Sequence, residues 1–284
     1  MSDPPLFSVI VTTYGRSAFI DAALESLFAQ TIQDFEVVLV VDGGEVPTGL
    51  TDDSRLRVVR RETNGGFPAA LNTGLEQIRG RYVTVLDDDD LYARDRLELG
   101  LRGMERAPVA ICWRGNPSTG KVGANRMLEG FVHDTILDRP IPTLGQTTVR
   151  REAMLTFDER CRNSADVEWW IRMSAHHPVT TEPQVGLWLR RHDSRNSLNF
   201  ESRYRSRTLI YQKHRDYFES HPNAEGRYLE RTAYFARMTG HPKSARNYLW
   251  RALRVRPRFG TLLRFMRAWL PVRQRESGTT QLSR

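Results

Sequence analysis

The feature that most constrains this chain is a short apolar run that ends in four consecutive carboxylates. Tyr82–Leu86 is rich in β-branched and aromatic residues, which predicts a buried strand. Its continuation is Asp87, Asp88, Asp89 and Asp90. Because unpaired carboxylates are costly to bury, we expect these residues at the end of the strand. Hard oxygen atoms placed side by side favour a divalent cation, Mg²⁺ or Mn²⁺, between them.

The same acidic run allows a second interpretation as a solvated turn. Helical periodicity is expected over Leu91–Arg106, and Asp90 would then stand at the N-terminal cap, a position that Asp favours. Metal binding and helix capping can involve different members of the run, so both interpretations stay open at this point.

Composition and charge narrow the class of protein. Of the 284 residues, 39% are hydrophobic and 27% charged, as in a globular protein with one large α/β domain and an appendage. The net charge of +8 and the pI of about 9.9 predict an anionic partner: nucleotide phosphates, nucleic acid or an acidic membrane surface. Two cysteines exclude a disulfide framework. With no secretory signal and no run near the ~18 apolar residues of a membrane span, we expect a cytoplasmic protein.

Short apolar runs alternate with segments of helical periodicity over the first 200 residues. We expect strands at Phe7–Thr12, Phe35–Val41, Leu56–Arg60, Tyr82–Leu86, Val109–Trp113 and Gln184–Leu189. We expect helices over Phe19–Phe28, Ala69–Ile78, Leu91–Arg106 and Ser164–Ala175. This alternation predicts a doubly wound α/β fold, in which ligands bind beyond the carboxyl ends of the strands.

Unusual residues follow three of the expected strands. They are Thr13-Tyr14-Gly15-Arg16, then Asp42-Gly43-Gly44, and the four aspartates. Because the carboxyl ends of parallel strands share one edge of a sheet, these segments predict one site there and not three separate turns.

From residue 201 onward the composition changes. The region 201–284 is rich in Arg, Tyr and Leu, has no strand-like run, and is expected to form a basic helical region outside the domain 1–200. Tyr228–Arg256 resembles a helical hairpin that turns at residues 240–242. Between Trp250 and Arg275 stand eight arginines and no acid, interleaved with apolar residues. This pattern predicts peripheral contact of a basic amphipathic helix with an anionic membrane; a helix packed on the first domain is the alternative.

Five segments occur in the order and spacing of glycosyltransferase family 2, and the chain resembles a member of that family. They are Phe7–Arg16, Val40–Gly44, Asn64–Gly74, Leu86–Asp90 and Asp166–Met173. The resemblance implies a GT-A fold, a three-layer α/β/α sandwich with a mixed, mainly parallel sheet. It implies inverting, metal-dependent transfer of a sugar from a nucleotide-diphosphate sugar to a saccharide or lipid-linked acceptor, in the synthesis of cell-surface polysaccharide or glycolipid.

The resemblance also implies which residues hold the nucleotide sugar. Thr13, Tyr14 and Arg16, which follow the first strand, would lie against the nucleotide. Asp42 would accept a hydrogen bond from the nucleotide base; the alternative is that Asp42 only forms an Asp-Gly turn. A second segment would lie over the diphosphate, and Asp87 and Asp88 would lie toward the sugar. The residues of these two segments are Thr13, Tyr14 and Arg16, then Asn64, Gly66 and Asn72.

Metal binding and proton transfer are assigned on the same resemblance. Asp89 would hold Mg²⁺ or Mn²⁺, and His192 would touch the metal or the diphosphate. Asp166 would be the general base for the acceptor hydroxyl, a role worth about 10²–10⁴-fold in rate. The alternative is that Asp166 only favours the first turn of a helix through the macrodipole. Trp169, beside this base, could stack on a sugar ring.

Three departures from the family pattern favour a rival interpretation. Val41, Leu71 and Ala165 stand where the family often has Asp, Arg and Glu, which would fit a binding module that has lost catalysis. A nucleic-acid-binding protein is a second rival, prompted by the pI. That class needs a basic stripe interleaved with base-stacking aromatics, whereas the expected strand ends are acidic, so we expect no nucleic-acid partner.

Overall fold

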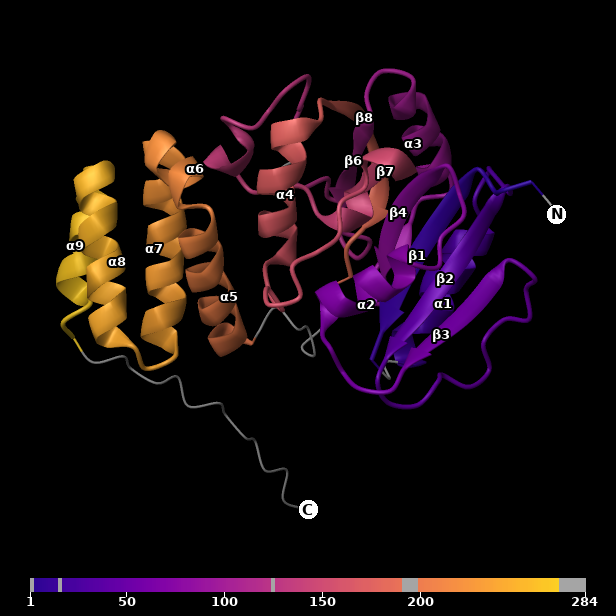
Figure 1. Cartoon of the computed structure of the whole chain (residues 1–284), viewed down its shortest axis with the longest axis horizontal. Helices are drawn as coiled ribbons and strands as arrows, with labels where there is room; N and C mark the ends of the chain where they lie inside the picture. Colours follow the sequence, from indigo (N-terminus) through magenta and orange to yellow (C-terminus); the bar gives the residue numbers. More distant parts are fainter. Residues whose placement is uncertain (1–2, 15–16, 124–125, 191–198, 271–284) are drawn as a thin grey trace, which may run out of the picture. The chain divides into compact units, whose positions relative to one another are not determined.

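The structure is a computed structural model that describes residues 3–14, 17–123, 126–190 and 199–270. The chain divides into two compact units, Met1–Leu198 and Asn199–Arg284, and each is described by itself (Figure 1). This division lies two residues from the boundary expected between 1–200 and 201–284.

The first unit is built on an eight-stranded mixed sheet with the order β3-β2-β1-β4-β7-β6-β8-β5. The pairs β1–β2, β2–β3, β1–β4 and β6–β8 are parallel, and β4–β7, β6–β7 and β5–β8 are antiparallel. The predicted α/β class with a mainly parallel sheet is therefore confirmed. The strands are β1 Phe7–Thr13, β2 Phe35–Asp42, β3 Leu56–Arg61, β4 Tyr82–Asp87, β5 Leu91–Tyr92, β6 Val109–Gly115, β7 Thr147–Arg150 and β8 Val179–Trp188.

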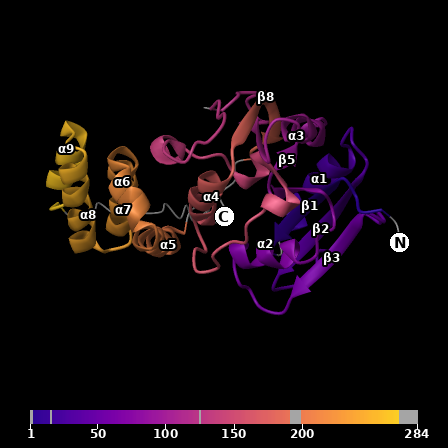
Figure 2. The ribbon, with the colours of Figure 1, turned by 45° about the horizontal axis from the view of Figure 1, so that its top comes forward.

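Helices cover both faces of this sheet (Figure 2). The central strands are buried along their whole length, which is why they are continuous apolar runs and do not alternate. Val9 and Val11 of β1 share a core with residues of α1 and α3. Ile10 of β1 faces the opposite side of the sheet and packs against Gly74 of α2. The approach is so close that a Cβ atom added to Gly74 would lie only 2.5 Å from the Cγ2 atom of Ile10. The helices are α1 Ser17–Phe28, α2 Phe67–Leu75, α3 Arg96–Met104 and α4 Ala165–His176.

One predicted helix is wrong at its start. The helix expected over Leu91–Arg106 begins only at Arg96, so Asp90 does not cap it. Leu91 and Tyr92 instead form β5, whose partners Trp188 and Leu187 lie in β8. Pairing with a strand distant in sequence has overridden the local helical periodicity.

The register of the strands gathers their carboxyl ends at one edge. Thr12 lies beside Asp87 and Thr13 beside Val41, so β1, β2 and β4 end together. Because β6 and β8 run parallel to each other and antiparallel to β7, Gly115 and Trp188 end at this same edge. The three segments singled out in the sequence therefore follow neighbouring strands, as expected.

The second unit is helical. The predicted hairpin is confirmed: α7 and α8 pack through Ala233, Ala236, Ala245 and Leu249, and Gly240 at the turn has a φ of 80°. The five helices described in this unit are α5 Phe200–Lys213, α6 Arg215–Ser220, α7 Pro222–Met238, α8 Pro242–Val255 and α9 Phe259–Arg267. Within the described ranges, every helix falls short of the length and hydropathy that crossing a membrane requires.

Candidate active site

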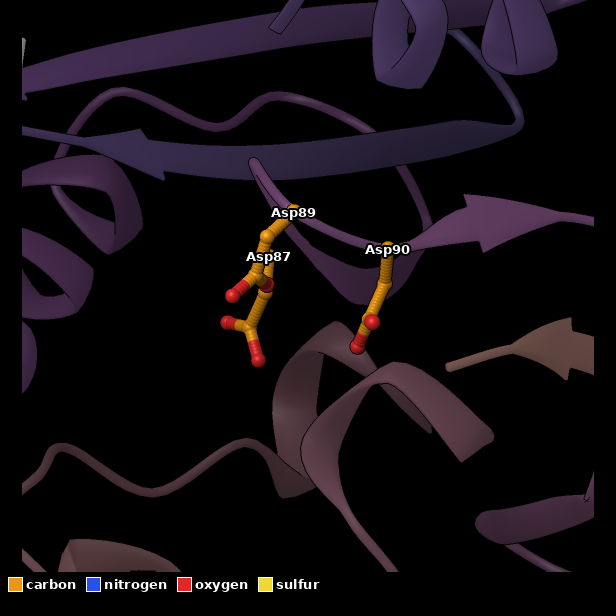
Figure 3. A group of neighbouring side chains, drawn as sticks. All are labelled: Asp87, Asp89 and Asp90. Atoms are coloured by element: carbon orange, nitrogen blue, oxygen red, sulfur yellow. The ribbon is translucent and has the colours of Figure 1, made fainter. Parts of the chain in front are cut away.

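A tight turn brings three of the four aspartates together. The backbone N–H of Asp90 donates to the carbonyl oxygen of Asp87 at 3.1 Å, which closes a β-turn at the end of β4. Asp87, Asp89 and Asp90 each offer a carboxylate oxygen, and these atoms lie within 4.8 Å of one another. Figure 3 shows all three side chains leaving the turn on the same side. Like charges this close repel, so three hard oxygen donors here suit a divalent cation. We call these residues the acidic cluster.

Asp88 takes the opposite direction. Its side chain is 0% exposed, and its Oδ2 atom accepts a hydrogen bond from Thr13 Oγ1 at 2.6 Å. This bond ties the ends of β1 and β4 together. Asp89 and Asp90 are also buried but keep 9% and 5% of their surface exposed, whereas Asp88 keeps none. Asp88 is therefore not placed to contact a donor as the resemblance implied, and the Thr13 hydroxyl is used within the fold.

Arg190, which follows β8, supports the backbone of the acidic turn. Its Nε donates to the carbonyl oxygen of Asp89 at 2.6 Å, and its Nη2 donates to those of Phe19 at 3.0 Å and Asp88 at 3.3 Å. Its backbone N–H donates to Asp90 Oδ1 at 3.1 Å. Burial lowers the pKa of this guanidinium, and the neighbouring aspartates raise it. The role of Arg190 is not marked in the sequence, because no local pattern shows which distant carbonyl groups its side chain contacts.

Arg114, near the end of β6, is influenced by the charges of both Asp90 and Asp166. Burial lowers the pKa of this half-buried guanidinium, whereas the charges of Asp90 and Asp166 raise it. Because such an influence falls off with distance, both carboxylates lie near one cation. Asp166 is half-buried in the first turn of α4, which begins directly after Ser164, a residue with a φ of 72°. The structure thus brings the expected base and the expected metal ligands to one region.

The residues after Asp166 have structural roles. Glu168 is fully buried and accepts two hydrogen bonds from Arg172, at 2.8 and 2.7 Å. Trp169 is also fully buried, donates from Nε1 to Leu155 O at 3.0 Å, and stacks on Phe157. The expectation that Trp169 stacks on a sugar ring is therefore wrong, since its ring is already enclosed by the protein.

Asp42 organises the glycine loop before α2. Its Oδ1 accepts hydrogen bonds from Gly65 N and Arg61 Nε, each at 2.9 Å, and its Oδ2 accepts from Gly66 N at 2.7 Å. Gly66 needs its φ of 89°, which glycine adopts without strain. The loop that the resemblance places over the diphosphate is therefore held by the carboxylate expected to meet the base.

Asn72 and Asn64 are tied to the segment 157–162. The Asn72 amide donates to Phe157 O and to Glu159 Oε1, both at 3.0 Å, and accepts from Phe157 N at 2.8 Å. Both of its N–H groups are thus engaged within the fold, so its side chain clamps a loop. The carbonyl oxygen of Asn64 accepts a hydrogen bond from Arg162 at 3.0 Å.

Tyr14 is placed differently from these residues. Its ring is 57% exposed at the end of β1, and a Cβ atom added to Gly44 would lie 3.9 Å from it. An exposed aromatic ring beside the end of β2 is available to stack on a ligand. Arg16 and His192, two further expected site residues, lie outside the described residues.

Comparison with known proteins decides the family. The family model described as glycosyl transferase family 2 matches residues 8–158, which is more than half of the chain. This protein belongs to glycosyl transferase family 2. The matched part of this family 2 protein contains the acidic cluster and the glycine loop, and it ends before Asp166.

Curated relatives of this family 2 protein match only in part. It is 27% identical over 187 residues to an uncharacterized glycosyltransferase of Rickettsia felis, covering 61% of this chain and 31% of the relative. It is 32% identical over 137 residues to TuaG of Bacillus subtilis, a putative teichuronic acid biosynthesis glycosyltransferase, covering 45% of this chain and 53% of TuaG. The alignments therefore span less than two thirds of these relatives.

Solved structures establish the GT-A fold for this family 2 protein. TarS 1–349 of S. aureus, in complex with UDP-GlcNAc, has a TM-score of 0.63 and 19% identity, covering 88% of this chain and 82% of that one. The mannosyltransferase PcManGT of Pyrobaculum calidifontis, in complex with GDP-Man and Mn²⁺, has a TM-score of 0.55 and 18% identity, covering 92% and 79%. At these identities the likeness concerns the fold alone.

Proposed function

We propose that this protein is a metal-dependent, inverting glycosyltransferase that moves a sugar from a nucleotide-diphosphate sugar to an acceptor hydroxyl. The observation that carries the proposal is the acidic cluster, three carboxylate oxygens within 4.8 Å at the carboxyl edge of the sheet. A fourth carboxylate, that of Asp166, raises the pKa of the same Arg114 guanidinium as Asp90 does. One edge thus carries donors for a cation and a separate candidate base.

The acidic cluster has the donor set for Mg²⁺ or Mn²⁺. Asp89, with Asp87 and Asp90, would hold the ion, because all three offer hard oxygen atoms. When bound, such an ion neutralises charge on the leaving diphosphate. Thr13 and Arg190 act through the protein itself: one holds Asp88 inward and the other fixes the backbone of Asp89.

The donor would lie across the ends of β1, β2 and β4. In this proposal Tyr14 stacks on the nucleotide base, and Asp42, which accepts hydrogen bonds from the Gly65 and Gly66 amides, fixes the backbone of the glycine loop beside the diphosphate. TarS binds UDP-GlcNAc and PcManGT binds GDP-Man, which supports nucleotide-diphosphate sugars as the class of donor.

Asp166 would act on the acceptor. As the acceptor oxygen attacks the anomeric carbon, Asp166 takes its proton, and the bond from that carbon to the diphosphate oxygen breaks. Attack on the face opposite the leaving group inverts the configuration. Arg114 offers a counter-charge to both Asp166 and Asp90, whose charges raise the pKa of its guanidinium against the lowering effect of burial.

The outer face of α9 is suited to a membrane surface. Thr261 and Ala268 are buried, whereas Phe259, Met266 and Trp269 are 75%, 60% and 66% exposed. Ala268 and Trp269 directly follow α9, and Phe265 is the large apolar residue of α9 that packs on the core of the unit. The other large apolar side chains of this segment are exposed, which is unusual in a soluble unit. Residues 231–270 also carry ten lysines and arginines and no acid, which complements anionic lipid headgroups.

We therefore place the reaction at the cytoplasmic face of the cell membrane, with α9 in peripheral contact with anionic lipid. A saccharide or lipid-linked acceptor in cell-surface polysaccharide or glycolipid synthesis fits this setting. The named role of TuaG in teichuronic acid biosynthesis supports it.

The proposal is tested by measuring release of nucleoside diphosphate from a panel of UDP- and GDP-sugars, with Mn²⁺ and with EDTA. We expect release from at least one donor, lost in EDTA and in Asp89→Asn, and a product of inverted anomeric configuration by NMR. Absence of both turnover and thermal stabilisation by every donor in Mn²⁺ would refute the proposal, whereas stabilisation by a donor without any turnover would favour the binding-module interpretation.

A further inference from the structure

The C-terminal unit contains a cavity of about 250 Å³ that the proposed reaction does not use. On one side it is lined by Tyr211 and Gln212 of α5 and Arg215 of α6. On the other side, α8 contributes Asn247 and Arg251. Two guanidinium groups and neutral polar side chains thus line one open cavity, at which Gln212, Arg215 and Asn247 are exposed.

Arg251 is held in place by a neutral group. Its Nη2 donates to Tyr211 Oη at 2.6 Å, and Tyr211 Oη donates to Glu225 Oε1 at 2.5 Å. Burial, together with the hydrogen bond to Glu225, raises the pKa of Tyr211 to about 12, so its phenol stays protonated. Glu225 is itself buried. The direction of both hydrogen bonds is therefore defined, and the guanidinium is positioned before any ligand arrives.

The charge of Arg251 is available to a ligand. Among the described residues it forms no salt bridge, because Tyr211 separates it from Glu225. A guanidinium has five N–H donors, and one of them is used in the bond to Tyr211. Arg215, whose charge also acts on Tyr211, pairs with Glu219 through Nε and keeps its other donors. Two guanidinium groups with unused N–H donors beside one cavity are suited to bind a carboxylate or a phosphate group.

The rest of the lining is suited to hydroxyl groups. Within the described residues, the side chains of Gln212, Ser244 and Asn247, all at the cavity, form no hydrogen bonds with the protein. Tyr248 also lines the cavity, and its hydroxyl group forms a 3.1 Å hydrogen bond with the Thr208 hydroxyl group. Amides, a hydroxyl and aromatic rings are groups that bind sugars. Because Gln212 and Asn247 are exposed, an apolar ligand would displace solvent from them without replacing its hydrogen bonds.

We propose that this cavity binds a saccharide that bears a carboxylate or phosphate group. The neutral amides would contact its hydroxyl groups, and Arg251 with Arg215 would contact its anionic group. That this saccharide is part of the acceptor rests on the proposed function, whereas the binding site itself does not. A site of this kind would hold an acidic polymer on the enzyme between successive additions.

Calorimetry on the full chain tests the site with three probes in 0.15 M salt: oligogalacturonate, phosphorylated maltooligosaccharides and neutral maltooligosaccharides. We expect binding of a carboxylate or a phosphate probe and none of the neutral one. Arg251→Gln should weaken this binding by about tenfold or more, because a charge-assisted contact is lost. Tyr211→Phe, which removes the group that positions Arg251, should weaken it as well.

Arg254→Gln is the matched control, because it removes an exposed charge from the same helix outside the cavity. It should bind the probe like the unaltered protein. Binding that is equal in Arg251→Gln and the unaltered protein, or equally reduced in Arg254→Gln, would overturn the site. Absence of binding by both acidic probes would also overturn it. Donor hydrolysis, measured without acceptor, reports on the proposed function separately.

Discussion

The Nε atom of Arg190 donates a hydrogen bond to the carbonyl oxygen of Asp89 at 2.6 Å, across 101 positions of sequence. A cation from the end of β8 therefore holds the backbone of the turn that carries the acidic cluster. Its charge also reduces the repulsion between carboxylates within 4.8 Å of one another. The order of the cluster thus depends on a residue that is not one of its donors.

Replacing Arg190 should disorder the acidic turn. Arg190→Ala removes three side-chain hydrogen bonds, so we expect a loss of about 1–3 kcal/mol in the free energy of unfolding and weaker Mn²⁺ binding. Urea denaturation and Mn²⁺ titration measure the two effects. Arg94→Ala, a substitution of an exposed residue, is the control and should alter neither the free energy of unfolding nor the Mn²⁺ affinity. If Arg190→Ala were as stable as the unaltered protein and bound Mn²⁺ with full affinity, Arg190 would not support the acidic turn.

Asp89→Asn should separate metal binding from folding. The amide keeps the shape of the side chain but loses the charge that a hard cation needs, so Mn²⁺ affinity and donor turnover should both fall by about a hundredfold. Electron paramagnetic resonance of free Mn²⁺ and nucleoside diphosphate release are the measurements. The exposed Asp52→Asn serves as control. Unchanged Mn²⁺ affinity in Asp89→Asn would remove this residue from the metal site.

Asp166→Asn should spare donor binding and abolish transfer. Because Asp166 is proposed to act on the acceptor, its loss should reduce the transfer rate by about 10²–10⁴-fold. Calorimetry with the donor and Mn²⁺ should give the same affinity as the unaltered protein. Normal transfer by this variant would exclude Asp166 as the base, and loss of donor affinity would move it to the donor site.

Glu168→Gln should have the opposite signature, although it lies two residues away. Its carboxylate is buried against Arg172, so neutralising it leaves a partly buried cation without its ion pair. We expect a loss of roughly 2–3 kcal/mol in the free energy of unfolding. At a temperature where the variant is folded, transfer should stay within a fewfold of normal. A strong loss of transfer without a loss of stability would give Glu168 a part in catalysis.

The face of α9 should bind anionic vesicles. Met266→Glu combined with Trp269→Glu places charge on its exposed apolar residues, so co-sedimentation with phosphatidylglycerol vesicles should weaken by about tenfold or more. Raising the salt concentration should weaken binding of the unaltered protein, because the arginines are screened. Met238→Glu, at the exposed end of α7, is the control. If the unaltered protein bound neutral phosphatidylcholine vesicles as strongly as anionic ones, the arginines would not contribute to membrane binding through their charge.

Much of the framework could be predicted from local pattern. The runs that became β1, β2 and β4 are apolar along their length because both faces are buried, and the aspartates had to follow a strand because carboxylates resist desolvation. The α7–α8 hairpin followed from helical periodicity and Gly240. These properties depend on residues that are close together in the sequence, and they can therefore be predicted from it.

The sequence by itself determined that acidic side chains meet at the carboxyl edge of a mainly parallel sheet. Only the tertiary structure decided which three converge, because Asp88 turns inward to Thr13, 75 positions away. It likewise decided that Trp169 is enclosed and that Leu91 pairs with Trp188. The direction of a side chain at a strand end depends on hydrogen bonds and packing with distant segments, and those partners exist only once the chain has folded.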